Sequence, residues 1–181
     1  MKRLVIVNGP MAVGKTTVCR ELKRLAQPCV FLDGDWCWDM EPFVVTEETK
    51  ALVMDNITSV LRRFLACPAF ETVIFCWVLH QQEIMDSLLA RLELAQWDSV
   101  RQDTARPDTA GVQVRVFTLM ADPESLRAHV ERDTAAGLRT PDVLARSLER
   151  LPLYERMDTE KLWVKGRSPR ELAEEIMRRL G

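Results

Sequence analysis

Short apolar segments alternate with longer amphipathic ones along most of the chain. Consecutive residues of the apolar segments are hydrophobic, which is typical of strands buried on both faces of a sheet. The predicted strands span residues 4–7, 29–32, 72–78, 112–120 and 162–164. The first of them ends directly before a turn that contains glycine.

The segments between the strands repeat apolar residues every three or four positions, which predicts helices. These helices span residues 15–26, 46–67, 84–92, 122–133, 142–151 and 168–180. Several begin with capping residues: Thr46 precedes two glutamates, Asp122 precedes a proline, and Ser168 starts a capping box. We therefore expect a helix after almost every strand.

Alternating strands and helices require crossover connections, and right-handed crossovers produce a parallel sheet with helices on both faces. We therefore predict a single α/β domain over residues 1–181 with three layers. Residues 96–111 are polar and lack apolar periodicity, which predicts a long mobile loop. Residues 134–141 predict a flexible link within a lid over residues 132–150.

Composition and charge exclude several classes of protein. The 181 residues include 47% hydrophobic and 29% charged residues, with a formal net charge of -2. These values are ordinary for a globular domain, and the slight acidic excess argues against nucleic acid as a partner. Five cysteines without CxxC spacing and two histidines supply a zinc site poorly, so we expect reduced and mostly buried thiols.

The N-terminal apolar run Leu4–Val7 is too short for a targeting or membrane segment. A signal peptide needs about 7–15 apolar residues, and a membrane span needs about 20. We therefore expect a soluble, cytoplasmic protein without a membrane partner. The sequence leaves open whether the protein is a monomer or a homodimer.

A phosphate-binding motif follows the first strand. Residues 9–16, Gly-Pro-Met-Ala-Val-Gly-Lys-Thr, fit G-x-x-x-x-G-K-[ST] between a buried strand and a helix. Such a loop turns backbone N–H groups towards phosphates, with Lys15 at the β- and γ-phosphates and the Thr16 hydroxyl on Mg²⁺. The residues expected to bind the nucleotide are Gly9, Ala12, Val13, Gly14, Lys15, Thr16 and Thr17.

The motifs of other nucleotide-hydrolysing classes are missing from the sequence. A switch GTPase needs DxxG after a strand and NKxD, but residues 108–111 match DxxG before a strand and no NKxD occurs. ABC-, RecA- and AAA-type ATPases need an acidic pair at the end of a buried strand. The end of the third predicted strand, Ile74-Phe75-Cys76-Trp77, contains no carboxylate, so no machinery that activates water is visible.

Two carboxylates follow the second predicted strand in Asp33-Gly34-Asp35. Because parallel strands present their carboxyl ends at one edge, both carboxylates should face the phosphate loop. In phosphoryl transfer one carboxylate can hold Mg²⁺ through water, and the other can accept the proton of an acceptor hydroxyl. The alternative is a simple Asp-Gly turn.

The short phosphate loop, DGD after the second strand and a later arginine-rich segment resemble the small P-loop kinases. These include shikimate, gluconate, adenylylsulfate and nucleoside monophosphate kinases and chloramphenicol phosphotransferase. Residues 31–45 with Phe75-Cys76-Trp77 also resemble a bacterial group of nucleotide kinases or AAA-family ATPases. The resemblance implies a five-stranded sheet in the order 2-3-1-4-5 and transfer of phosphate from ATP, with Mg²⁺, to a small molecule.

The resemblance also implies roles for single residues. Asp33 would be an outer-shell Mg²⁺ ligand beside Thr16, and Asp35 would be the base that binds the acceptor. Arg132 resembles the lid arginine that packs on adenine, and Arg139 resembles the one that contacts phosphate.

Arginines surround the flexible link at positions 127, 132, 139, 146 and 150. Arg146 and Arg150 are four residues apart and therefore share a helix face. A transferring phosphoryl group needs cations that arrive when the site closes, and guanidinium groups suit it. We therefore expect Arg139 and Arg146 to take part in catalysis.

Aromatic residues flank the expected acceptor site. Trp36 and Trp38 follow DGD, while Trp77 and His80 follow the third strand. These tryptophans favour a flat or apolar acceptor, but they could equally form a hydrophobic plug under the next helix. His80 could bind the acceptor or cap a helix. No arginine pair suited to an acceptor phosphate lies between the second and third strands, which favours an uncharged hydroxyl compound.

Two other functions compete with a kinase. The segment Val116–Met120 and the phosphate loop faintly resemble tunicamycin-resistance proteins, which would imply nucleotide-dependent binding of a drug. A regulatory NTPase would hydrolyse nucleotide slowly without an acceptor and would contact a protein partner through residues 96–111. The sequence does not distinguish ATP from GTP.

Overall fold

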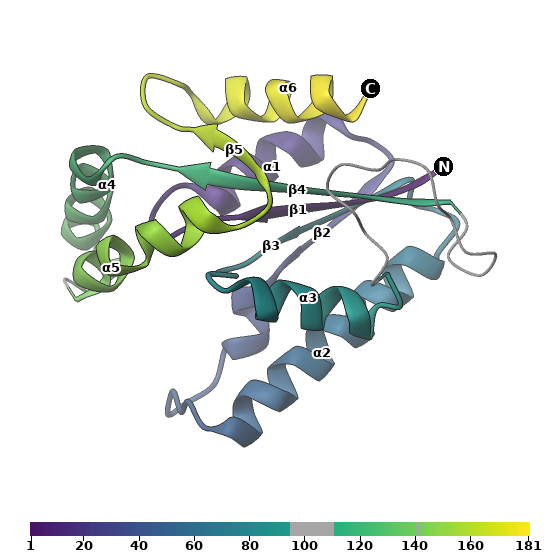
Figure 1. Ribbon diagram of the computed structural model, residues 1–181, viewed down its shortest axis with the longest axis horizontal. Coiled ribbons are helices and arrows are strands. Elements are labelled where there is room, and N and C mark those ends of the chain that lie inside the picture. Colours follow the sequence, from purple (N-terminus) through teal and green to yellow (C-terminus); the bar gives the residue numbers. More distant parts are fainter. Residues whose placement is uncertain (95–110, 141) are drawn as a thin grey trace.

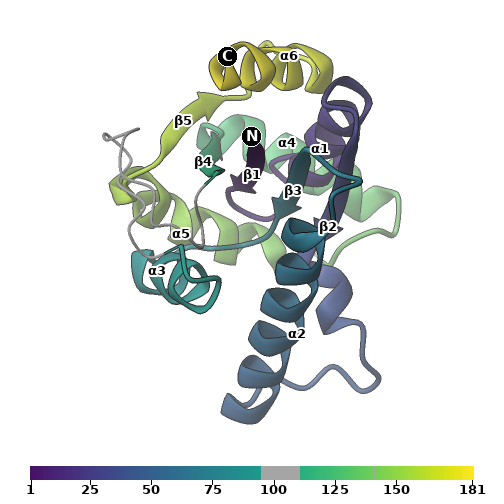
Figure 2. The ribbon, with the colours of Figure 1, turned by 90° about the vertical axis from the view of Figure 1, so that its right-hand side faces the viewer.

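The computed structural model describes residues 1–94, 111–140 and 142–181. Within these residues, a five-stranded parallel sheet lies between two layers of helices (Figure 1 and Figure 2). The strands are β1 Lys2–Asn8, β2 Cys29–Asp33, β3 Thr72–Cys76, β4 Val112–Met120 and β5 Glu160–Trp163. They run in the order β2-β3-β1-β4-β5, which confirms the predicted class and strand order.

Helices cover both faces of the sheet. In Figure 1 and Figure 2, α1 and α6 lie on one side of the strands, and α2 and α3 lie on the other. The helices are α1 Lys15–Leu25, α2 Glu47–Ala66, α3 Gln82–Arg91, α4 Pro123–Ala135, α5 Val143–Arg156 and α6 Pro169–Leu180. Helices α4 and α5 stand at the end of the sheet where β4 ends (Figure 1).

Strand β1 shows why the apolar segments do not alternate with polar residues. Leu4 and Ile6 belong to the apolar cluster that includes α2 and α3, whereas Val5 and Val7 belong to the cluster that includes α1 and α6. All four side chains are fully buried. Because both faces of β1 are covered, its end is fixed from two sides, and so is the start of the loop that follows.

Helix capping agrees with the expectations from the sequence. The Thr46 hydroxyl accepts a hydrogen bond from Thr49 N at 3.2 Å. Asp122 Oδ1 accepts one from Ser125 N at 2.9 Å, and this bond lowers the pKa of Asp122 to about 2. Ser168 forms the predicted capping box at the start of α6. The Asp122 side chain is therefore committed to its helix.

Local structure differs from the prediction at several segments; β3, for example, ends at Cys76, two residues before its predicted end. Residues Gly34–Trp38 form a 3₁₀ helix, η1, which starts where Asp33 Oδ1 accepts a hydrogen bond from Asp35 N at 3.2 Å. Helix α5 continues past its predicted end, through Pro152 to Arg156. Burial of Tyr154, which is 0% exposed, offsets the hydrogen bond that the proline cannot donate.

All five cysteines are free thiols. Cys19 and Cys76 are buried, and the other three are half-buried, so the expectation of mostly buried thiols holds only in part. Residues 96–110 of the predicted loop and residue 141 of the predicted lid lie outside the described residues. Within the described part of the chain, every helix is too short or too polar to traverse a bilayer.

Gly34 packs directly against Trp77, which joins the ends of β2 and β3. A Cβ atom at position 34 would lie 2.5 Å from Trp77 Cγ. We expect Gly34→Ala to lower the free energy of unfolding by about 1–3 kcal/mol, because the added methyl overlaps the indole. Urea denaturation measures this change.

The control for this prediction is the same substitution in a Trp77→Ala background. There the methyl group meets no indole, so Gly34→Ala should cost much less. A loss of the same size in both backgrounds would show that the contact with Trp77 is not the cause.

Candidate active site

The loop between β1 and α1 has the backbone of a phosphate-binding loop. Gly9, Ala12 and Gly14 have positive φ angles of 142°, 63° and 102°. A Cβ atom on Gly9 would lie 2.7 Å from the carbonyl oxygen of Leu119, so only glycine fits against β4 there. The curvature of the loop is therefore set by its glycines and by its packing against β4, and α1 begins directly after it.

Lys15 lies inside this loop. Its Nζ donates hydrogen bonds of 2.9 Å to the carbonyl oxygens of Gly9 and Pro10. The residue is only 9% exposed, and burial lowers the pKa of its ammonium group, although Cys76 and Asp35 oppose that shift. A buried cation whose bonds go to loop carbonyls is poised to exchange them for phosphate oxygens.

Thr16 connects the phosphate loop to the end of β2. Its hydroxyl donates to Asp33 Oδ2 at 2.7 Å, and Asp33 is 5% exposed. The other carboxylate oxygen accepts from Asp35 N. Hydroxyl and carboxylate oxygens are the ligands that Mg²⁺ prefers, directly or through water. The pair therefore fits the predicted magnesium site, although no cluster of three or more potential ligands occurs in the described ranges.

Asp35 lies in η1, directly after the end of β2. Its side chain is exposed to solvent, yet the protein around it raises the pKa of its carboxyl group by desolvation. Lys15 and Arg139 act in the opposite direction, and the Asp33 carboxylate adds to the rise. Together with the hydrogen bond between Thr16 and Asp33, these effects agree with two cations and two carboxylates near the phosphate loop, and the catalytic roles of these residues stay predictions.

Helices α4 and α5 rest on the phosphate loop. Ala12 packs with Val130 and Val143 in a small apolar cluster. The Ser147 hydroxyl donates to the carbonyl oxygen of Met11 at 3.4 Å. The base of the predicted lid is therefore in contact with the loop that would hold the phosphates.

Arg139 is the lid arginine whose charge reaches the site. Its Nε donates to Asp133 Oδ2 at 3.2 Å, and the side chain is 34% exposed. Its positive charge lowers the pKa of both Lys15 and Asp35. Asp133 thus holds Arg139 between α4 and the phosphate loop.

The other two assigned arginines face the solvent. Arg132 pairs with Asp133 at 3.3 Å, with 69% of its side chain exposed. Arg146 pairs with Asp142 at 2.6 Å, with 49% of its side chain exposed. Thr17, the last residue assigned to the nucleotide, is exposed at the start of α1. The roles of these three residues stay predictions.

The tryptophans divide between surface and core. Trp36 is 58% exposed and contacts Phe31 edge to face at 5.6 Å between ring centroids. Trp38 and Trp77 instead pack against the apolar cluster beneath the sheet. Trp38 and Trp77 therefore fit the interpretation as a hydrophobic plug, whereas η1 turns Trp36 outwards and its role in an acceptor site stays a prediction.

His80 lies in the loop between β3 and α3. The residue at the helix N-cap is Gln81, so His80 does not cap α3. Its Nδ1 atom is buried without a hydrogen-bond partner. Burial lowers the pKa of the imidazole, and the charge of Arg150 lowers it further, while a hydrogen bond with the backbone of Val78 acts in the opposite direction.

Asn8 is a site residue that sequence reasoning missed. It is 0% exposed, and its Nδ2 donates to Leu79 O at 2.7 Å, while Leu79 N donates to its Oδ1 at 2.9 Å. Its Nδ2 also lies 3.3 Å from Met157 Sδ. Asn8 thereby fastens the loop after β3 beside the phosphate loop. The only signal was a polar residue ending an apolar strand.

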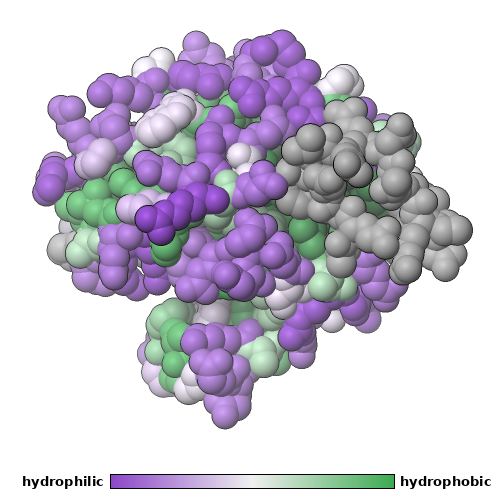
Figure 3. All heavy atoms as spheres, viewed as in Figure 1, coloured by the Kyte–Doolittle hydropathy of each residue, from purple (hydrophilic) through white to green (hydrophobic). Residues whose placement is uncertain are grey.

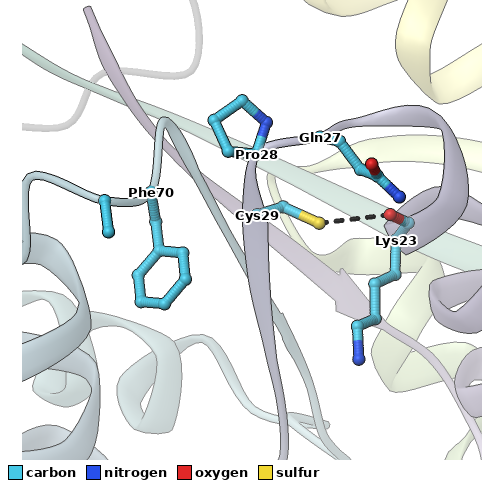
Figure 4. A pocket seen from close by; sticks show the side chains of 6 residues that line it. Lys23, Gln27, Pro28, Cys29 and Phe70 are labelled. Atoms are coloured by element: carbon cyan, nitrogen blue, oxygen red, sulfur yellow. Dashed lines mark hydrogen bonds between the residues drawn. The ribbon is translucent and has the colours of Figure 1, made fainter.

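An open pocket of about 480 Å³ lies at the opposite end of β2 (Figure 4). It is lined by Lys23, Gln27, Pro28, Cys29, Ala69 and Phe70. Cys29 begins β2, whereas Asp33 ends it, so the two sites lie at different ends of that strand. This pocket is therefore separate from the candidate active site.

The comparisons place the chain in a known fold. Residues 5–136 match the protein family described as AAA domain. A tunicamycin resistance protein from Deinococcus radiodurans is similar in structure, with a TM-score of 0.66 and 18% identity over 100% of this chain and 96% of that chain. A gluconokinase from Sinorhizobium meliloti 1021 has a TM-score of 0.64 and 17% identity over 99% of this chain and 93% of that chain.

A shikimate kinase from Acinetobacter baumannii, in complex with shikimate, has a TM-score of 0.61 and 20% identity over 99% of this chain and 93% of that chain. At these identities the likenesses establish a shared P-loop fold. No curated protein matches the chain.

The position of Lys15 generates a prediction about nucleotide binding. Lys15→Gln should weaken the binding of Mg·ATP at least about tenfold, because it removes a charge-assisted bond to phosphate. Isothermal titration calorimetry measures the dissociation constant.

The matched control is Lys23→Gln, the same change on the same helix at the end away from the loop. It should leave the affinity unchanged. If Lys15→Gln bound Mg·ATP as tightly as Lys23→Gln does, the phosphate-binding role of Lys15 would be wrong.

Proposed function

The chain belongs to the family described as AAA domain, and on this premise we propose that it is a small-molecule kinase. It would move the γ-phosphoryl group of ATP to a hydroxyl or phosphate group of a small acceptor. The observation that supports this most is the convergence of Lys15, Asp33, Asp35 and Arg139 at the carboxyl ends of the strands. Phosphoryl transfer needs such positioning and charge neutralisation more than it needs covalent chemistry by the protein.

The residues divide the work of the reaction. Asp35 orients the acceptor hydroxyl and takes its proton as the acceptor oxygen bonds to the γ-phosphorus and the bond to the β–γ bridging oxygen breaks, which releases ADP. Lys15, the loop amides and Arg139 stabilise the negative charge on the transferring group. Thr16 and Asp33 would hold Mg²⁺, which neutralises phosphate charge when bound.

The residues at the end of β3 favour phosphoryl transfer to an acceptor over hydrolysis of ATP. Cys76 and Trp77 occupy the place where a hydrolysing ATPase needs a carboxylate to activate water. Trp36 follows Asp35 directly in the sequence and exposes an aromatic surface to solvent. We therefore propose an acceptor with a flat or apolar portion.

A nucleotide-dependent binding protein is the second candidate. It is favoured by apolar side chains that stay exposed around η1 and the start of α2. In Figure 3 apolar residues appear on the projection at the bottom of the view, where Figure 1 places α2 and the segment before it. The exposed side chains are Trp36, Phe43, Val44, Val45 and Leu52.

The kinase proposal predicts that Asp35→Asn lowers turnover by orders of magnitude while leaving the affinity for ATP nearly unchanged, because the base is lost but the phosphate site is not. The assay is ADP release from Mg·ATP across pooled nucleosides, nucleotides, sugars, sugar acids and aromatic antibiotics. Asp39→Asn, the same change at an exposed position nearby, should keep full activity.

Three outcomes are decisive for this experiment. Stimulation by one pool that is lost only in Asp35→Asn supports the kinase. Equal loss of ATP binding would remove the proposed role of Asp35. Stoichiometric binding of a compound without ADP release would replace the kinase by the binding protein.

The raised pKa of Asp35 sets the acidic limb of the rate profile. A base acts only when ionised, so kcat/KM should fall as the pH drops through the pKa of Asp35. Desolvation raises that pKa above the ordinary value of 3.8, so the fall should be centred above that value. A profile that stays flat down to pH 4, about the ordinary aspartate pKa, would contradict Asp35 as the base.

A further inference from the structure

Two buried polar groups without hydrogen-bond partners lie near the proposed reaction centre. Tyr154 is 0% exposed, and its hydroxyl has no hydrogen-bond partner. The buried Nδ1 of His80 also has none. Unpaired buried polar atoms are costly, so a native protein that keeps two of them at one place commonly uses them for a ligand.

Hydrogen bonds bring together the two chain segments that carry His80 and Tyr154. Asn8 lies in contact with both Leu79 and Met157, and Asp158 N donates to Gln82 Oε1 at 3.3 Å. Residues 79–82, which contain His80, therefore run beside the end of α5. Arg150 and Tyr154 are four residues apart in that helix and share one face.

The close packing of Gly34 against Trp77 brings the segment after β3 next to the residues around Asp35. Burial raises the pKa of Tyr154 strongly, the Arg150 charge opposes the rise, and the Asp35 carboxylate adds to it. Arg150 also acts on the imidazole of His80. These electrostatic effects agree with a position of Arg150 and Tyr154 near His80 and Asp35.

Arg150 differs from the lid arginines on either side of the link. Arg132, Arg139 and Arg146 each pair with an aspartate. Arg150 is half-buried, and among the described residues it makes no ion pair or hydrogen bond. A half-buried guanidinium without a counter-ion, next to two unpaired polar groups, favours the binding of an anion at this place.

We propose that Arg150, Tyr154 and His80 bind an acidic group of the acceptor, a carboxylate or a phosphate monoester, while Asp35 holds the oxygen that reacts. The guanidinium neutralises the anion, and the tyrosine hydroxyl and an imidazole N–H donate to it. This inference rests on the proposed kinase function and narrows its substrate class. The sequence favoured an uncharged acceptor because no arginine pair precedes the third strand; the cation comes from α5 instead.

The test measures anion binding without turnover. The protein is saturated with Mg²⁺ and a non-hydrolysable ATP analogue, which occupies the phosphate loop, and is titrated at constant pH with inorganic phosphate and, separately, with acetate. NMR follows the imidazole signals, which are easily assigned because the chain has only two histidines, His80 and His129. We expect a saturable shift of His80 and none of His129.

Two variants separate the site from general effects. Arg150→Gln should weaken anion binding at least about tenfold, the loss expected for a charge-assisted bond. Arg156→Gln, the same change at an exposed position of the same helix, should have no effect. Tyr154→Phe removes only an unpaired hydroxyl, so this variant should fold normally. It should still weaken the binding of the anion severalfold.

The outcomes distinguish this inference from the proposed function. Saturation by phosphate alone supports a site for a phosphate monoester, saturation by acetate alone supports a site for a carboxylate, and saturation by both supports an acidic-group site that accepts either. No saturable shift of His80 with either anion, or equal affinity in Arg150→Gln, would overturn the acidic-group site. Because this assay involves no catalysis, such a result leaves the kinase intact, whereas anion binding without ADP release from any acceptor pool would overturn the kinase alone.

Discussion

Strand β1 lies between β3 and β4, and its four central residues, Leu4 to Val7, are fully buried between two layers of helices. A strand covered on every side has no freedom to shift its register, because any shift would expose apolar area and break both ladders. The phosphate loop begins at its end, and the neighbouring strands end at the same edge. The position of each chemical group therefore follows from the burial of one strand.

Contacts between distant segments of the chain hold the residues at that edge of the sheet together. Thr16 bonds Asp33 across the gap between α1 and β2, Asn8 bonds Leu79 after β3, and Gly34 allows Trp77 to close over the end of β2. Each of these contacts joins two segments that are far apart in the sequence. They fix the Asp33 carboxylate and the segments on either side of it, which contributes to the preorganisation that electrostatic catalysis would require.

The sequence predicted the parts of the site that depend on local pattern. The phosphate loop, the carboxylates of DGD and the helix caps could be predicted because spacing and residue type alone specify them. The pairing of Asn8 and the gathering of His80, Arg150 and Tyr154 were not legible, since they depend on how α5 crosses the sheet. The tryptophans were ambiguous for the same reason: the turn of η1, set by the Asp33 side chain, decides which of them faces outwards.

The small cluster of Ala12, Val130 and Val143 joins the tip of the phosphate loop to the helices on both sides of Arg139. Such packing is a thermodynamic link, because a change in the loop alters the contacts of α4 and α5, and the reverse holds equally. A molecule that draws these helices inwards would tighten the grip on the triphosphate by the same factor by which the triphosphate tightens the grip on that molecule. In the proposed kinase, the cluster would therefore couple the binding of the nucleotide to the binding of the acceptor.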